Sequence, residues 1–180
     1  AHYWAREFRK LGHEVKLISP QFVKPYVKSN KNDAVDSEAI CEAVARPNMR
    51  FVAIKEVEQQ DLQNLHRVRE RLVKARTALV NEIRGLLQEY GIVLPQKIGH
   101  LRKGLPEVLS NSEDRLSTLS LEVFRQLRQE LSDLDEKISF YDDKIGAVHD
   151  SHPVCRRLAE IPGVGPLSST ALVAAMYIIQ

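Results

Sequence analysis

The stretch that decides the fold reads FRQLRQELSDLDEKISFYDDKIGAV and runs from Phe124 to Val148. Its apolar side chains recur at alternating spacings of three and four residues, at Phe124, Leu127, Leu131, Leu134, Ile138, Tyr141, Ile145 and Val148. This alternation places all of them along one seam of an α-helix, as in the a and d positions of a coiled coil. We therefore predict a long helix over residues 117–149.

An earlier stretch carries a similar pattern, with leucines every seven residues at Leu65, Leu72, Leu79 and Leu86. Val68 and Ala75 lie between them, and we predict a second long helix over residues 57–90. The two helices could form an antiparallel hairpin within one chain or pair between the protomers of a homo-oligomer, and the sequence leaves both open. Residues 92–116 are predicted to be irregular. They contain four residues that interrupt helices: Pro95, Gly99, Gly104 and Pro106.

The first 56 residues indicate a small α/β arrangement. Two helices (residues 2–11 and 33–45) alternate with two short strands (14–18 and 51–54), and the basic segment 21–31 is predicted to be a loop. This order favours half of a sheet with parallel strands, whose partner strands would lie before Ala1. Seven apolar side chains are expected in its core: Tyr3, Trp4 and Phe8 on the first helix, and Ala34, Ile40, Cys41 and Val44 on the second.

These patterns predict a mostly α fold with a partial α/β part at the N-terminus, in the regions 1–56, 57–150 and 151–180. Residues 1–103 hold 19 basic and 12 acidic residues, whereas residues 104–180 hold 7 and 12. A basic first half suits a polyanionic partner, and ordinary surface charge explains it equally well. Cys41 and Cys155 lack the spacing of a zinc site or a disulfide framework and fit a reducing cytosol. No apolar run is long enough to span a membrane.

Asp33 and Asp36 stand at the start of the predicted helix 33–45. Residues three apart in a first turn point the same way, so the two carboxylates can bind one hard divalent cation. Helix capping explains them too, because Asn32 or Asp33 can cap the helix and a negative charge is favourable in its first turn. The residues alone favour capping, since two-metal phosphodiester chemistry needs further acidic ligands.

Residues 151–180 predict two short helices, 153–159 and 166–176, joined by a tight turn over residues 161–165. This is a helix-hairpin-helix pattern. Gly163 and Gly165, with Val164 between them, would let the backbone approach DNA closely, and the N–H groups that open the second helix would receive a phosphate. A packed helical corner is the alternative interpretation.

Three hydroxyls follow in the second of these helices, at Ser168, Ser169 and Thr170. They are interpreted as ordinary helix-start residues and not as nucleophiles, because no His or Lys base neighbours them.

Basic residues supply further candidate DNA contacts. Lys28 and Lys31 lie in the basic segment before Asp33. A basic stripe on the predicted helix 57–90 consists of Arg67, Arg71 and Lys74, with Arg69 and Arg76 beside it. Such a stripe can bind the backbone of a nucleic acid. A solvated helix face is the equal alternative, since Glu70 can pair with Lys74 four residues later.

Several strings, in this order, resemble the DEDD-type transposases of the insertion-sequence-110 family. They are AHYWARE from Ala1, LGHEV from Leu11, QFVKPYVK from Gln21, KND followed by Asp36, and IPGVGP from Ile161. The likeness extends over nearly the whole chain. It implies a RuvC-like, ribonuclease-H-type nuclease domain, then a coiled-coil region, then a second domain that carries the helix-hairpin-helix.

The resemblance also implies a chemistry. Family members act as DNA recombinases that move insertion sequences, some of them with a guide RNA. Their acidic tetrad binds Mg²⁺, and a serine of the second domain attacks DNA. Asp33 and Asp36 fall on the last two aspartates of the tetrad, so the resemblance favours metal binding over capping. The first Asp and the Glu of the tetrad are expected before Ala1, and the serine after Gln180. The ending Met176–Gln180 also departs from the Gly-Asp that the family shows at that point.

We therefore predict an incomplete Mg²⁺-dependent DNA transposase of the bacterial cytoplasm, nucleoid-associated when it acts. Its expected partners are DNA, a guide RNA as a further candidate, and a second copy through the coiled coil. We expect no strand cleavage by this chain on its own. Two alternatives are a non-catalytic coiled-coil module that binds DNA and a RuvC-like resolvase nuclease.

Overall fold

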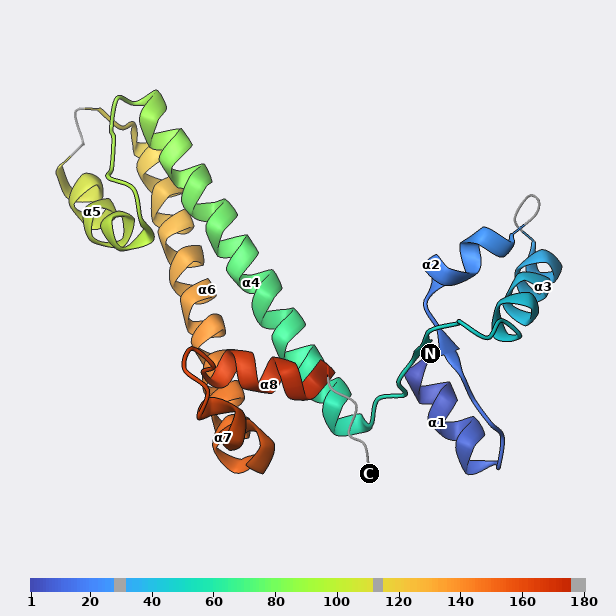
Figure 1. Cartoon of the computed structure of the whole chain (residues 1–180). Coiled ribbons are helices and arrows are strands. Elements are labelled where there is room, and N and C mark those ends of the chain that lie inside the picture. The colour runs from blue at the N-terminus through green and yellow to red at the C-terminus, as the bar shows by residue number, and fades with distance from the viewer. Residues whose placement is uncertain (28–31, 112–114, 176–180) are drawn as a thin grey trace. The chain divides into compact units, whose positions relative to one another are not determined.

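The computed structural model describes residues 1–27, 32–111 and 115–175, and helices make up most of it (Figure 1). This confirms the prediction of a mostly α protein with a small strand-containing part. The chain divides into two compact units, whose described residues are 1–60 and 61–175. Each unit is described by itself below.

The first unit pairs two short strands antiparallel, so the prediction of parallel strands is wrong. Leu17 lies opposite Val52 and Ile18 opposite Phe51. A parallel pair needs a crossover, usually a helix that covers the sheet, whereas the helices between these strands pack against one another. The elements in order are α1 (His2–Lys10), β1 (Leu17–Ile18), α2 (Pro20–Val23), the 3-10 helix η1 (Lys24–Tyr26), α3 (Asp33–Val44) and β2 (Phe51–Val52).

Segment 21–31 is not the predicted loop in its first half. Helix α2 and η1 occupy residues 20–26, with Pro20 as the first residue of α2. Proline is favoured at this position because its missing N–H needs no partner in the first turn.

Helix α1 is attached to its unit through polar contacts. The Arg6 guanidinium donates to the Lys55 carbonyl oxygen and to Gln60 Oε1, each at 2.5 Å. The Lys55 N–H in turn donates to His2 Nδ1 at 3.1 Å. Ala5 is the buried residue of this helix. The face that carries His2 and Arg6, four residues apart, is therefore the one that docks.

The aromatic side chains of α1 are exposed, so the prediction that they form core is wrong. Tyr3, Trp4 and Phe8 are 56%, 61% and 45% exposed. They contact one another, with ring centroids 5.2 Å apart for Tyr3 and Trp4 and 6.1 Å apart for Trp4 and Phe8. Docking through the polar face turns them outward.

Helix α3 buries two alanines, Ala39 and Ala43, where it packs against α2 and η1. Small side chains four residues apart let neighbouring helices approach closely. The four residues predicted to be buried on this helix are instead exposed: Ala34, Ile40, Cys41 and Val44. That prediction is wrong because the contact is made by the face of Ala39 and Ala43, which leaves those four side chains outside it.

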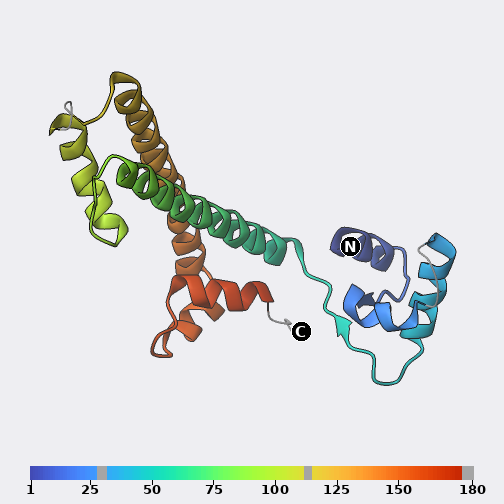
Figure 2. The same cartoon turned by 90° about the horizontal axis from the view of Figure 1, so that it is seen from above.

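The second unit is an antiparallel helical hairpin with three shorter helices attached (Figures 1 and 2). Its elements are α4 (Val57–Glu89), which enters this unit at Asp61, α5 (Ile98–Asn111), α6 (Thr118–Ser151), α7 (Pro153–Ala159) and α8 (Pro166–Ala175). The two long helices confirm the predicted ones to within two residues at each end. In both views α5 lies at the end where the hairpin turns, whereas α7 and α8 lie towards the other end.

Two ion pairs fix the register of the hairpin. Arg69 of α4 pairs with Asp142 of α6, and Arg76 pairs with Asp135 at 3.0 Å. The position on α4 rises by seven residues while the position on α6 falls by seven, as an antiparallel pair requires. The predicted apolar seam of α6 is thus covered within one chain, and the predicted homo-oligomer through the coiled coil stays a prediction.

The core of this hairpin joins α4, α5 and α6. Leu72 and Leu79 of the predicted leucine seam are buried, but Leu86 is 38% exposed. Ile83 and Leu87, both fully buried, take its place. An α-helix has 3.6 residues per turn, so a strict seven-residue repeat rotates away from the contact along a straight helix.

Residues 92–116 are not irregular throughout, because α5 occupies residues 98–111. Leu101, Leu105 and Leu109 are buried against the hairpin at helical spacing. Their burial stabilises the helix despite Pro106 in its interior. Gly104 faces Leu94 so closely that a Cβ there would lie 2.8 Å from the leucine side chain.

Candidate functional site

The predicted metal ligands Asp33 and Asp36 occupy the opening turn of α3. The cap of this helix is Asn32, whose Oδ1 accepts the Val35 N–H at 2.8 Å. Asp33 and Asp36 are exposed, and within the described ranges no hydrogen bond or ion pair engages either carboxylate. Capping by Asp33, one of the alternatives weighed from the sequence, is therefore ruled out by Asn32.

The donor set at this turn fits part of a shell for a hard divalent cation. Side chains three apart on a helix have Cβ atoms about 5–6 Å apart, and two exposed carboxylates at that spacing can share one cation. Within residues 1–27, 32–111 and 115–175, no group of three or more His, Cys, Asp or Glu side chains is placed to bind a metal. The described residues therefore supply no third side-chain ligand of these types to the pair.

The predicted turn between the two C-terminal helices is formed as expected. Gly163 has a φ of +87°, which favours glycine, and the Val164 N–H donates to the Ile161 carbonyl oxygen at 3.0 Å. The Ser169 N–H donates to the Gly165 carbonyl oxygen at 2.9 Å and begins the hydrogen bonding of α8. Gly165 itself has no positive φ and open space where a Cβ would be.

Free backbone donors gather at this turn. In the described part of the chain, no backbone carbonyl accepts from the N–H of Gly163, Gly165, Leu167 or Ser168. The first N–H groups of any helix lack partners within it and carry its positive dipole end. An anion such as a phosphate could bind here.

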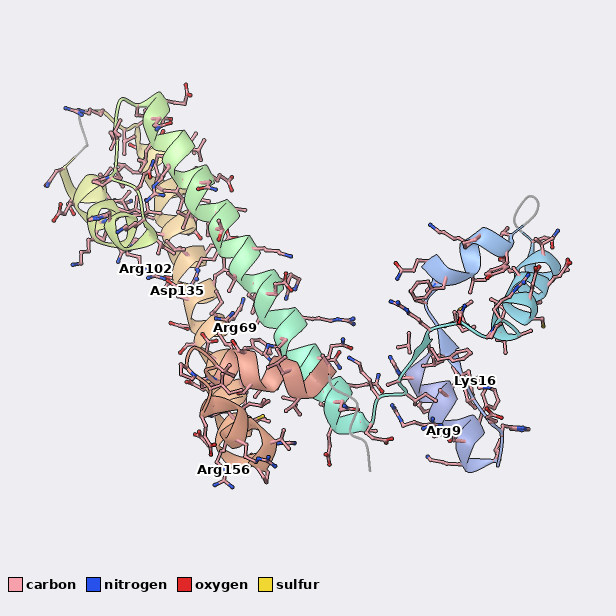
Figure 3. The ribbon with its side chains drawn as sticks, viewed as in Figure 1. Arg9, Lys16, Arg69, Arg102, Asp135 and Arg156 are labelled. Atoms are coloured by element: carbon pink, nitrogen blue, oxygen red, sulfur yellow. The ribbon has the colours of Figure 1, made fainter. Side chains whose placement is uncertain are left out.

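Two arginines beside the turn were missed by sequence reasoning. Arg156 and Arg157 are exposed in the last turn of α7, just before the turn (Figure 3 labels Arg156). The signal was available, since two adjacent basic residues precede the Ile161–Gly165 turn. The acidic balance of residues 104–180 as a whole conceals this local pair of basic residues.

The hydroxyls of α8 do have histidine neighbours, so the expectation that no base neighbours them is wrong. Ser169 Oγ lies 2.8 Å from His149 Nδ1 of α6, and Thr170 Oγ1 lies 3.0 Å from His66 Nε2 of α4. Both hydroxyls are 0% exposed and also donate to the Pro166 carbonyl oxygen. They hold α8 against the hairpin, and their burial denies access to a substrate.

Burial shapes the acid–base properties of this cluster. It lowers the pKa of His66, and the nearby charge of Arg69 lowers it further. Burial also raises the pKa of the Cys155 thiol, against which a hydrogen bond with Ser169 acts. A neutral imidazole and a protonated thiol are therefore favoured around α8.

The predicted basic stripe on α4 is exposed at all three of its positions, Arg67, Arg71 and Lys74. Lys74 pairs with Glu70 at 2.6 Å, as the solvated-face interpretation expected. Arg69 and Arg76 face α6 instead and form its register pairs. Of the other predicted DNA contacts, Lys28 and Lys31 lie outside the described residues.

Over the ranges that the structure describes, none of the helices combines the length and apolar character that a membrane span requires.

Comparisons with known proteins identify the family of this chain. The family model for DEDD transposases of the IS110 type, described as "Transposase", matches residues 1–92. The "Probable family 20 transposase" of Pseudomonas aeruginosa is 48% identical over 176 residues, which are 97% of this chain and 52% of that protein. No solved structure matches the chain.

Two more relatives are similar. The "Transposase for insertion sequence element IS1111A" of Coxiella burnetii is 47% identical and covers 98% of this chain and 48% of its own length. The "Transposase for insertion sequence element IS1328" of Yersinia enterocolitica is 40% identical and covers 96% and 51%. The chain spans about half the length of each relative.

The family model covers more than half of the chain, from the aromatic helix α1 to the end of α4. The class of protein that this match defines is the transposases. The chain belongs to the DEDD transposase family of the IS110 type.

Proposed function

We propose that Asp33 and Asp36 supply two of the acidic ligands of a Mg²⁺ centre that cleaves and rejoins DNA strands in insertion-sequence transposition. The observation that carries this proposal is the exposed carboxylate pair on the first turn of α3, freed from capping by Asn32, within a transposase family match. When bound, the metal would stabilise charge on the attacking and leaving oxygens of the phosphodiester. Asp33 and Asp36 would hold the metal through their carboxylates.

The DNA backbone is proposed to contact two surfaces. The first is the α7–α8 turn, where Gly163 and Gly165, on either side of Val164, present free N–H groups beside Arg156 and Arg157. This arrangement supports a helix-hairpin-helix role. The second surface is the basic stripe of Arg67, Arg71 and Lys74. Lys28 and Lys31 are proposed contacts on sequence grounds alone.

The regions follow the same proposal. Residues 1–56 would be part of a RuvC-like nuclease domain, residues 57–150 a coiled-coil region, and residues 151–180 the start of a second transposase domain. Action on DNA in the bacterial cytoplasm, at the nucleoid, accords with the bacterial relatives. A guide RNA and a homo-oligomer remain predictions from the family resemblance.

Metal binding tests the proposal directly. Mg²⁺ or Mn²⁺ titrated into the chain in a calorimeter should bind weakly, and Asp33→Asn or Asp36→Asn should weaken binding at least about tenfold. The chain offers a matched control in Glu58 and Asp61, a second exposed acidic pair three residues apart at the start of α4. If Asp61→Asn weakens binding as much as Asp36→Asn, binding is unspecific and the proposed centre is wrong.

DNA binding and cleavage are tested separately. The chain should bind a labelled DNA duplex, and Arg156→Gln should lower the salt dependence of the affinity by about one phosphate contact, whereas the exposed Arg115→Gln should not. Because two carboxylates do not complete a two-metal shell, the same DNA should stay uncut with Mg²⁺. Mg²⁺-dependent cutting that Asp33→Ala abolishes would overturn this last expectation.

A further inference from the structure

A cavity of about 220 Å³ lies between α5 and α6 in the second unit. Its polar lining comes from Arg102 of α5 and from Arg128, Gln129, Ser132 and Asp135 of α6, and leucines from both helices form its apolar part. Figure 3 shows Arg102 and Asp135 lying together at this junction. The cavity is distinct from α3 and from the α7–α8 turn.

The cavity carries more positive than negative charge. Arg102 grips the Asp135 carboxylate with two donors, Nε to Oδ2 at 2.8 Å and Nη2 to Oδ1 at 2.6 Å. Arg76 of α4 donates to the same Oδ1 at 3.0 Å. One carboxylate therefore faces two guanidinium groups.

Arg128 brings a further guanidinium group to the cavity. Arg128 is exposed, lines the cavity and makes no ion pair within the described ranges. Asp133, a nearby acid on α6, accepts from Gln129 Nε2 at 2.8 Å. The lining of the cavity, with Arg102 and Arg128 against Asp135, therefore has an excess of one positive charge.

Three side chains of the lining can donate hydrogen bonds to a phosphate: Arg102, Arg128 and Ser132. Arg128 and Ser132 are one helical turn apart and share a face of α6. The Asp135 contact occupies Nε and Nη2 of Arg102 and holds its planar group in place, which leaves Nη1 for a ligand. Arginine forks match the geometry of phosphate oxygens.

We propose that this cavity is a phosphate-binding site, formed by Arg128, Ser132 and the Asp135-braced Arg102. The phosphate group can come from the backbone of a nucleic acid or from a free oligophosphate. The nucleic-acid arm rests on the proposed DNA binding, whereas the free-phosphate arm does not.

Two titrations on the full chain test the site. Arg128→Gln should weaken binding of a labelled DNA duplex about three- to tenfold and lower the slope of log affinity against log salt by about 0.9. Pyrophosphate should compete with the DNA, and its own binding, followed by calorimetry, should weaken in Arg128→Gln and in Ser132→Ala. The matched control is Arg125→Gln, an exposed arginine on the same helix.

The outcomes separate the possibilities. Loss of both DNA and pyrophosphate affinity in Arg128→Gln but not in Arg125→Gln supports the site with a nucleic acid as the source. Loss of pyrophosphate affinity alone supports the site with a free oligophosphate. Equal losses in the two arginine variants, or none, overturn the proposal, because general surface charge then accounts for binding. The metal titration of Asp36→Asn is independent of these results, so a failure of the proposed metal centre is distinguishable.

Discussion

The two units bury different kinds of side chain. In the described residues of the first unit, the buried apolar side chains are the alanines Ala5, Ala39 and Ala43, whereas the second unit buries leucines, isoleucines and Phe124. Burying a large aliphatic or aromatic side chain contributes about 1.5–3 kcal/mol, far more than an alanine methyl group. Unit 1 is instead held by polar contacts such as those of Arg6 and His2 with Lys55. Apolar burial therefore predicts a stable second unit and a weakly stable first one.

Hydrogen exchange tests whether the two units differ in stability, and we expect it to show the largest effect among these predictions. Amides in the middle of α4 and α6 should open only with free energies on the order of 5 kcal/mol or more, whereas amides of α1 and α3 should open at about 0–2 kcal/mol. Exchange measured by mass spectrometry on the full chain would show this as protection that differs by several hundredfold. Equal protection of α3 and α6 would contradict it.

Two substitutions on α6 test how much a buried side chain contributes to the stability of the second unit. Phe124→Ala should lower the free energy of unfolding by about 3–5 kcal/mol, because the side chain is 2% exposed in the cluster that joins α4, α5 and α6. Leu119→Ala, on the same helix but 70% exposed, should change it by less than about 0.5 kcal/mol. Urea unfolding followed by circular dichroism measures both. Similar losses in the two variants would mean that the hairpin does not pack as described.

The sequence was sufficient for the long helices because their signal is local. The spacing of Phe124, Leu131 and Ile138 repeats along one face, and the cooperativity of a long helix does the rest. Helix α5 was missed because Pro106 and Gly104 outweighed the shorter pattern of buried leucines. The strand direction was missed because it depends on where α2, η1 and α3 pack, which no local pattern records.

Some residues of the candidate sites could likewise be located from the sequence, whereas others depend on how distant helices pack. Asp33 and Asp36, and the turn at Gly163, could be located from short strings because each occupies one helix start. The histidine contacts could not, since His66 is distant in sequence from Thr170 and meets it only when α8 packs on α4. The Arg102–Asp135 contact likewise needs the packing of α5 on α6, which the predicted irregular segment excluded.

Glycine-to-alanine substitutions in the helices should change the free energy of unfolding less than Phe124→Ala does, and at Gly85 in the opposite direction. Gly85→Ala should raise the free energy of unfolding by about 0.5–1 kcal/mol, because a Cβ at this position inside α4 meets open space and alanine favours a helix. Gly104→Ala should gain less or lose stability, since its Cβ would lie 2.8 Å from Leu94 Cδ2 and that side chain must move. Thermal unfolding of the two variants compares them. Equal stabilisation would show that the contact with Leu94 is loose.

The smallest effect is expected from pH, and it compares one histidine in each unit. Burial lowers the pKa of His66 below its ordinary value of 6.5, with a smaller contribution from Arg69. Burial likewise lowers the pKa of His2, helped by Lys55. The unfolded chain therefore binds protons at a higher pH than the folded chain does. The stability contribution is fully present above the unfolded pKa of about 6.5 and decreases as the pH falls below it towards the lowered folded pKa.

Substitution of the two histidines should affect two different measurements. His66→Gln should flatten the pH dependence of global unfolding, because α4 belongs to the stable hairpin. His2→Gln should change the pH dependence of local exchange in α1, because protonation of Nδ1 removes the acceptor for the Lys55 N–H. The exposed His100→Gln is the control. If His2→Gln flattens global unfolding as much as His66→Gln does, the two units unfold together, and the difference inferred from their buried side chains is wrong.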